Sequence, residues 1–118
     1  MHFMIIERFR SAEAVAAVYE RFAERGRLMP EGLKYVSSWI EPNFDRCFLV
    51  AECDDPRMLQ RWVLQWNDLI EFEIIPVVPS KETAEVVTSS LNSTAAKRHE
   101  PRSRTSRSKS TRPRGRAL

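Results

Sequence analysis

The chain has 118 residues, which is enough for one domain, and a net charge of +3. That average hides two parts of opposite sign. Residues 1–96 hold ten Lys/Arg and fifteen Asp/Glu, a net charge of −5, whereas residues 97–118 hold nine Lys/Arg and one Glu, a net charge of +8. The acidic part would repel phosphate, so nucleic-acid binding by that part is excluded and any such binding must come from the basic tail.

The N-terminus carries no signal for secretion. Met1–Ile6 is followed at once by Glu7 and Arg8, which leaves no basic segment, no adequate apolar stretch and no small-residue cleavage site. No apolar run approaches the roughly 18 to 20 residues that a membrane-spanning helix needs. We therefore expect a cytoplasmic protein with no membrane partner.

Strand and helix patterns alternate along the first two thirds of the chain. Ser11 can cap a helix that Gly26 ends, and an Asp cap followed by Pro56 at the first helical position is the strongest local signal. Glu41–Asp45 reads as the short connection of a hairpin. In chain order the predicted elements are a strand at 2–9, a helix at 12–25, strands at 33–40 and 46–53, a helix at 56–68 and a strand at 70–78.

This β-α-β-β-α-β order predicts the ferredoxin-like α+β fold, a four-stranded antiparallel sheet with two helices on one face. We expect the first and third strands at the centre, parallel to each other, and the second and fourth at the edges. Periodicity disappears near Ser80, although 82–87 could add a helical turn. The sequence thus predicts a domain at 1–83 and a disordered, Ser/Arg-rich basic tail at 84–118.

The sheet face away from the helices should be polar if it meets water, but both faces of the predicted strands are apolar. On the first strand, Phe3 and Ile5 would lie on one face, and Met4 and Ile6 would lie on the other. A patch of this kind favours burial against a second copy of the sheet. We therefore expect a homodimer, in the arrangement called a dimeric α/β barrel, with room for a small ligand inside.

Short motifs in every predicted element resemble the bacterial domain-of-unknown-function family 3303. The resemblance covers roughly residues 1–83 and none of the tail. It implies a relative of the dimeric α/β barrels and brings no established activity, so no catalytic residue is carried over. The motifs are Glu7-Arg8-Phe9, Gly26-Arg27, Pro30-Glu31-Gly32-Leu33, Tyr35-Val36-Ser37-Ser38-Trp39, Arg46-Cys47-Phe48, Asp54-Asp55, Trp62, Trp66 and Phe72-Glu73-Ile74-Ile75-Pro76-Val77.

The first candidate site is a row of polar tips on the second strand. Strict alternation would place Tyr35, Ser37 and Trp39 on one face, about 6 to 7 Å apart, where a phenol, a hydroxyl and an indole N–H could orient a small ligand. The alternative is that the two aromatic residues are core or interface residues and that Ser37 is a spacer.

Glu7 is the candidate catalytic residue. It shares a strand face with Ile5 and Phe9, so its carboxyl would sit in apolar surroundings with a raised pKa and could serve as a general base. The alternative is an ordinary ion pair with Arg8 or Arg46 at the end of the strand.

Three further features are weaker. Glu71 and Glu73 share a face of an edge strand, where charges discourage aggregation more often than they catalyse. A nucleophilic Cys47 would require His2 to fold beside it. With Cys53 on the same strand, about 20 Å from Cys47, a disulfide is excluded and two free thiols are expected.

Nothing in the sequence indicates a cofactor or a metal. Trp62 and Trp66 could form a stacking platform, but at helical spacing they are more typical of a core. Two Cys and two His without ligand spacing do not make a zinc site. Gly26, Gly32 and Gly115 are too scattered for a phosphate-binding loop.

Three functions therefore stay open. The favoured one is a homodimeric small-ligand-binding protein or cofactor-independent enzyme, with the pocket on the open sheet face. The second is a non-catalytic structural or regulatory dimer, and the tail could simply be solubilising. The third is non-specific binding of nucleic-acid phosphates through the basic tail residues Arg102, Arg104, Arg107, Lys109, Arg112, Arg114 and Arg116.

Overall fold

The structure, a computed structural model, describes residues 1–97. It divides the chain into two units, Met1–Ser80 and Lys81–Leu118. All six predicted elements are confirmed, with boundaries that differ by at most two residues. The elements are β1 (His2–Phe9), α1 (Ala12–Arg25), β2 (Lys34–Ile40), β3 (Arg46–Glu52), α2 (Arg57–Trp66), β4 (Ile70–Val77) and α3 (Ser80–Lys97).

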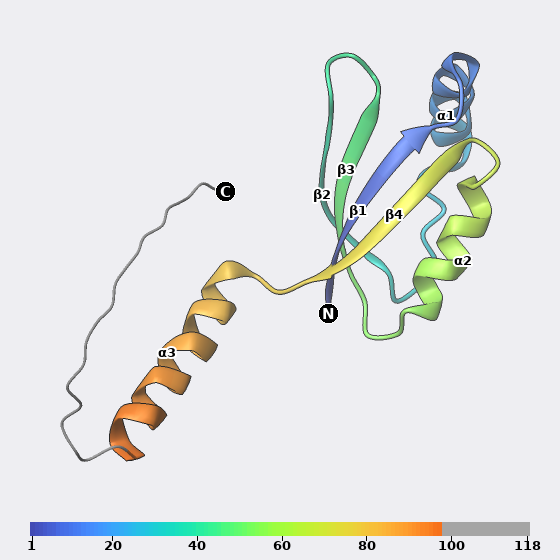
Figure 1. The fold of residues 1–118 in the computed structure, drawn as a ribbon. Helices are drawn as coiled ribbons and strands as arrows, with labels where there is room; N and C mark the ends of the chain where they lie inside the picture. The colour runs from blue at the N-terminus through green and yellow to red at the C-terminus, as the bar shows by residue number, and fades with distance from the viewer. Residues whose placement is uncertain (98–118) are drawn as a thin grey trace. The chain divides into compact units, whose positions relative to one another are not determined.

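The strands form one sheet in the order β2-β3-β1-β4, and α1 and α2 cover one of its faces (Figure 1). The ferredoxin-like α+β fold is thereby confirmed. Every neighbouring pair is antiparallel, so the prediction that the two central strands run parallel was wrong. The crossover through α1 makes β1 and β2 run the same way, and β3, the hairpin partner of β2, lies between them and must oppose both.

Local capping explains where the helices begin and end. Ser11 Oγ accepts a hydrogen bond from the amide of Ala14 at 3.1 Å, and Gly26, with φ of 71°, donates its N–H to the carbonyl of Phe22 at 2.8 Å. At the start of α2, Asp55 Oδ1 accepts from the amide of Arg57 at 3.0 Å. The aspartate at this position therefore satisfies a free helix amide, as the sequence predicted.

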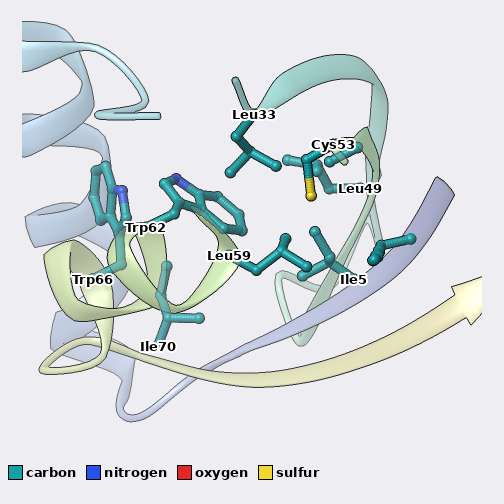
Figure 2. Packing of buried hydrophobic residues seen from close by; sticks show 10 residues of the cluster. Ile5, Leu33, Leu49, Cys53, Leu59, Trp62, Trp66 and Ile70 are labelled. Carbon is teal, nitrogen blue, oxygen red and sulfur yellow. The ribbon is translucent and has the colours of Figure 1, made fainter. Parts of the chain in front are cut away.

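The hydrophobic core lies between the sheet and the two helices (Figure 2). Ile5 and Leu49, on the central strands, are fully buried there. From α2, Leu59, Trp62 and Trp66 pack against them, each less than 5% exposed. The alternation of buried and half-buried residues along β1 therefore assigns Phe3, Ile5 and Glu7 to the helix-covered face.

The opposite face of the sheet, the open face, is apolar at its centre. Met4 on β1 lies between Val50 of β3 and Ile75 of β4, and Ile6 lies beside Phe48 of β3. Trp39, at the edge, is opposite Phe48 and is 59% exposed. Apolar residues therefore lie on both faces of the sheet, as the sequence predicted.

Helix α3 corrects the predicted extent of the tail. The sequence predicted disorder from residue 84, with at most one helical turn before residue 88, but α3 continues to Lys97. Ala, Glu, Lys and Leu in this segment favour a helix, whereas its Ser, Thr, Val and Asn residues favour one less. The Thr94 hydroxyl donates a hydrogen bond to the backbone carbonyl of Ser90, one turn earlier in α3, at 2.9 Å. Within residues 1–97, no helix has both the length and the apolar character to span a bilayer.

Candidate functional site

A pocket of about 190 Å³ lies on the helix-covered side of the sheet, within the first unit. The sequence predicted a pocket on the open face, whereas this one is bounded by β1, β2, β3, α1 and α2. Most of its wall is apolar. Its lining residues are Glu7, Phe9, Val18, Tyr19, Phe22, Arg27, Ser38, Trp39, Ile40, Cys47, Trp62, Trp66 and Ile70.

Glu7 is the buried acid of this pocket. Its side chain is on the same face of β1 as Ile5, and the residue is only 8% exposed. Burial raises the pKa of the Glu7 carboxyl to about 7, and the nearby positive charge of Arg27 opposes that shift. At neutral pH the protonated and the ionised forms therefore coexist.

No described residue forms an ion pair with Glu7, so the ion-pair alternative was wrong. Arg46 instead binds Glu41 through two hydrogen bonds, of 2.9 and 2.8 Å. Arg8 is exposed and lies between Arg46 and Glu71 on the open face. The Glu7 carboxyl is left facing an apolar pocket, in which a polar group without a partner is costly.

Arg27 lies in the loop between α1 and β2 and brings a positive charge to the pocket. Its guanidinium carbon lies 3.9 Å from the centre of the Tyr35 ring and 5.2 Å from that of the Phe22 ring. No ion pair of residues 1–97 includes Arg27. Two aromatic rings therefore position a cation that has no carboxylate bound to it within the described chain.

The backbone of Arg27 is fixed by the two tryptophans of α2. The indole N–H groups of Trp62 and Trp66 both donate to the Arg27 carbonyl oxygen, at 2.9 and 2.8 Å. Figure 2 shows the two indoles extending from the same side of α2. The sequence placed these residues in the core, which is confirmed, and they also line the pocket and anchor the loop that carries the cation.

Cys47 lies directly opposite Glu7 on the neighbouring strand. Burial and the proximity of Glu7 raise the pKa of the Cys47 thiol to about 11, so it is a protonated thiol near neutral pH. His2 lies at the other end of β1, with its Nε2 3.1 Å from Glu52. The Cys–His pair that the sequence left open is therefore not formed, and Cys47 and Cys53 are both free thiols, as predicted.

The predicted row of Tyr35, Ser37 and Trp39 is broken by a β-bulge at Val36. Tyr35 pairs with Ala51, which faces the helices, whereas Ser37 pairs with Val50 on the open face. The extra residue moves Tyr35 to the opposite side of the sheet from Ser37 and Trp39. The Tyr35 hydroxyl instead shares a hydrogen bond of 2.8 Å with Ser38 Oγ, and Ser38 lines the pocket.

The remaining candidates do not form a second site in the structure. Glu71 and Glu73 share the open face of the edge strand β4, and Glu71 lies 3.7 Å from Arg10. In the part of the chain that the structure describes, no three His, Cys, Asp or Glu residues come together as a metal site would require. The seven basic tail residues proposed to bind nucleic acid, from Arg102 to Arg116, lie outside the described residues.

Sequence reasoning missed Arg27 and Ser38. The pairing of Glu7 with Cys47 depends on the register of β1 against β3, which are not joined by a hairpin, so no local pattern indicated it. Arg27 had a weak signal, its position directly after Gly26, which ends α1. The direction of its side chain depends on loop geometry, including the positive φ of 61° at Leu28, which no periodicity encodes.

Comparison with known proteins gives a family and no activity. No curated protein matches the chain significantly. No solved structure matches it either. The sequence profile of one family, described as a domain of unknown function (DUF3303), matches residues 1–91, which is further than the predicted resemblance and reaches into α3. Because this match covers most of the sequence, the chain belongs to the DUF3303 family.

Proposed function

We propose that the protein binds a small organic molecule in the pocket beside Glu7 and that the Glu7 carboxyl exchanges a proton with it. One observation carries the proposal: a carboxyl that is 8% exposed, with no described partner and a pKa of about 7, lines a pocket. Buried polar groups in native proteins almost always have a partner, so a carboxyl of this kind indicates a ligand or an ordered water. Near-neutral acids of this kind are typical of acid–base catalysis.

The proposed reaction moves one proton from the substrate to Glu7 and back. Ionised Glu7 takes a proton from an acidic O–H or C–H of the substrate, and the electron pair of that bond stays on the substrate. Arg27 stabilises the negative charge that develops there. The same carboxyl then returns the proton, at the same or at another atom, so the enzyme ends the cycle unchanged.

The apolar open face supports the further proposal that the protein is a homodimer. Met4, Ile6, Phe48, Val50 and Ile75 form its centre, with Glu73 beside Ile6 on the edge strand, and further charged residues lie toward its ends. Lys34 and His2 meet Glu52 at one end, and Arg10 meets Glu71 near the other. Both signs of charge at each end allow a second copy to match the face after a twofold rotation.

The proposed function is tested by titrating the Glu7 carboxyl directly. In a protein labelled with ¹³C at glutamate side chains, the Glu7 carboxyl signal, assigned by its absence in Glu7→Gln, is expected to titrate near pH 7. A set of neutral and charged single-ring fragments is then screened by the NMR shifts of the Trp62 and Trp66 indole N–H groups. A normal carboxyl titration near pH 4.5, together with no fragment bound, would refute this function.

A second candidate function is favoured by the separation of charge along the chain. The tail, residues 97–118, has a net charge of +8 next to an acidic domain. Phosphate binding by such a tail would be independent of nucleotide sequence and would weaken steeply as salt is added. Replacing its seven candidate basic residues by Gln in the full chain is expected to abolish binding to DNA and RNA at low salt, and unchanged binding would refute this candidate.

A further inference from the structure

We propose that the pocket takes a ring-sized organic monoanion, with its anionic oxygen on the Arg27 guanidinium and its apolar body among the aromatic side chains. The inference rests on the proposed function, because it names the class of molecule that the Glu7 pocket binds. Three properties of the pocket carry it: its charge, its volume and the proton on Glu7.

The charge of the pocket selects an anion. Arg27 and Glu7 are the lining residues that carry formal charge, and Arg27 forms no ion pair within residues 1–97. The rings of Tyr35 and Phe22 hold the guanidinium without using its hydrogen-bond donors. A carboxylate or an enolate oxygen is the group that such donors bind best. A second negative charge on the ligand would face the apolar wall and would be costly to desolvate.

The volume of the pocket is enough to bury about one ring. An engineered protein cavity of about 150 Å³ with apolar walls binds benzene. The present pocket, of about 190 Å³, therefore has room for a six-membered ring and one small substituent. Its walls include Phe9, Phe22, Trp62 and Trp66, whose faces and edges favour a flat apolar body.

Binding of the anion depends on whether the Glu7 carboxyl carries its proton. When protonated, it is neutral and can donate a hydrogen bond to the bound anion, whereas ionised Glu7 repels it. The other titratable or charged residues of the pocket are Cys47 on β3, which lies opposite Glu7, Tyr19 on α1 and Arg27 in the loop. From β4 its neighbour is Phe72, and α2 contributes only indoles. Affinity for a monoanion should therefore fall as pH rises through about 7.

The test compares three probes of similar shape and different charge: benzoate, benzyl alcohol and benzylamine. Binding to the full chain is measured at pH 6 by the NMR shifts of the Trp62 and Trp66 indole N–H groups. Benzoate is expected to bind at least about tenfold more tightly than either other probe, as one charge-assisted hydrogen bond provides. Its affinity is expected to fall between pH 6 and 8 in the wild type and to stay constant in Glu7→Gln, which keeps a donor and has no proton to lose.

Two arginine variants assign the anion to its partner. Arg27→Gln is expected to remove the preference for benzoate, whereas Arg25→Gln, at an exposed position in the last turn of α1, makes the same change in net charge and is expected to leave it intact. If Arg27→Gln does not fold, the pH profile and the three-probe comparison in the wild type still decide the matter.

The possible failures are distinct. Equal or tighter binding of benzyl alcohol or benzylamine would overturn the monoanion assignment and leave the proposed pocket standing. A benzoate affinity that does not depend on pH, or that survives Arg27→Gln, would also overturn the assignment. Binding of none of the three probes would overturn both the assignment and the proposed ligand-binding function.

Discussion

Glu7 shows how a single residue can acquire its chemistry from its position alone. Its neighbours across the strands are Cys47 and Phe72, and neither offers the carboxyl a strong hydrogen bond. Desolvation therefore outweighs the attraction of Arg27, and the pKa rises to about 7. The same carboxylate on the open face would be solvated and would titrate in the ordinary range.

This raised pKa makes folding stability depend on pH. The native state holds the Glu7 proton up to about pH 7, whereas the unfolded chain loses it near pH 4.5. The free energy of unfolding should therefore fall as pH rises between these values, and the change amounts to about 3 kcal/mol at most. Below pH 4.5 both states are protonated and Glu7 carries no penalty.

The measurement is urea denaturation from pH 4.5 to pH 8 of wild type and Glu7→Gln. The variant is expected to lack the part of the slope that comes from Glu7 and to gain stability relative to wild type as pH rises. Glu13→Gln, in the first turn of α1 and exposed, is the matched control and should keep the slope of the wild type. Parallel curves for wild type and Glu7→Gln would contradict the assigned pKa.

Sequence alone predicted the burial of Glu7 but not the positive charge of Arg27 near it. Alternation along β1 assigns Glu7 to the face of Ile5 without any tertiary information. The position of Arg27 depends on two indoles from α2, which lie 35 and 39 residues further along the chain. A hydrogen bond across that separation leaves no local pattern, so the charge of the pocket could be found only from the folded chain.

At the scale of elements, β2 is where simple alternation fails. The bulge at Val36 puts Tyr35 and Ser38 on the helix-covered side and leaves Ser37 and Trp39 on the other. Nothing in the composition of the seven residues of β2 distinguishes a bulged strand from a regular one. Alternation with a period of two therefore predicted that β2 is a strand, but it assigned Tyr35 to the wrong face. A bulge depends on how the strand pairs with its neighbour, which the local sequence does not show.

The hairpin that joins β2 and β3 contains a strained residue. Phe44 has φ of 62°, in the left-handed region, and is 54% exposed, so little packing depends on its ring. Asn tolerates this conformation better than other residues with a side chain beyond Cβ. Phe44→Asn is expected to raise the free energy of unfolding by about 1 kcal/mol in chemical denaturation.

Phe44→Ala separates strain from loss of the ring. It removes the same aromatic group but keeps the cost of a positive φ, so it is expected to leave stability unchanged or lower it. A Phe44→Asn protein that is no more stable than Phe44→Ala would show that the turn carries no relievable strain.

At the scale of the whole molecule, the proposed dimer has a direct test on the open face. Trp39→Glu places a charge on the proposed interface beside Phe48. Large aromatic residues dominate interface energetics, so the dimer dissociation constant is expected to rise at least about tenfold in sedimentation velocity. Leu64→Glu, at a residue of α2 that is 71% exposed, introduces the same charge away from the sheet and should leave the dimer intact.

A wild-type chain that sediments as a monomer at all accessible concentrations would refute the dimer. Equal weakening by Trp39→Glu and Leu64→Glu would show that the open face is not the interface. Because Trp39 also lines the pocket, ligand binding is tested in the wild-type chain and not in Trp39→Glu.

The order of elements, the sheet and the apolar open face could all be predicted from sequence, because each depends on local periodicity. The full length of α3 could not. Val86, Val87 and Leu91 are exposed on α3, so the hydrophobic signal that marks a packed helix is weak there. Ten of its 18 residues are Ser, Thr, Val or Asn, which have low helix propensity, so propensity gave no clear helical signal either.

The distribution of the three tryptophans gives the protein built-in optical reporters. Trp62 and Trp66 are less than 5% exposed, donate to one shared carbonyl and border the pocket, whereas Trp39 is 59% exposed on the opposite face. Buried indoles emit at shorter wavelength than solvated ones. A Trp39→Phe chain would therefore emit only from the two buried indoles, so occupancy of the pocket can be followed in unlabelled protein without the signal of the exposed indole.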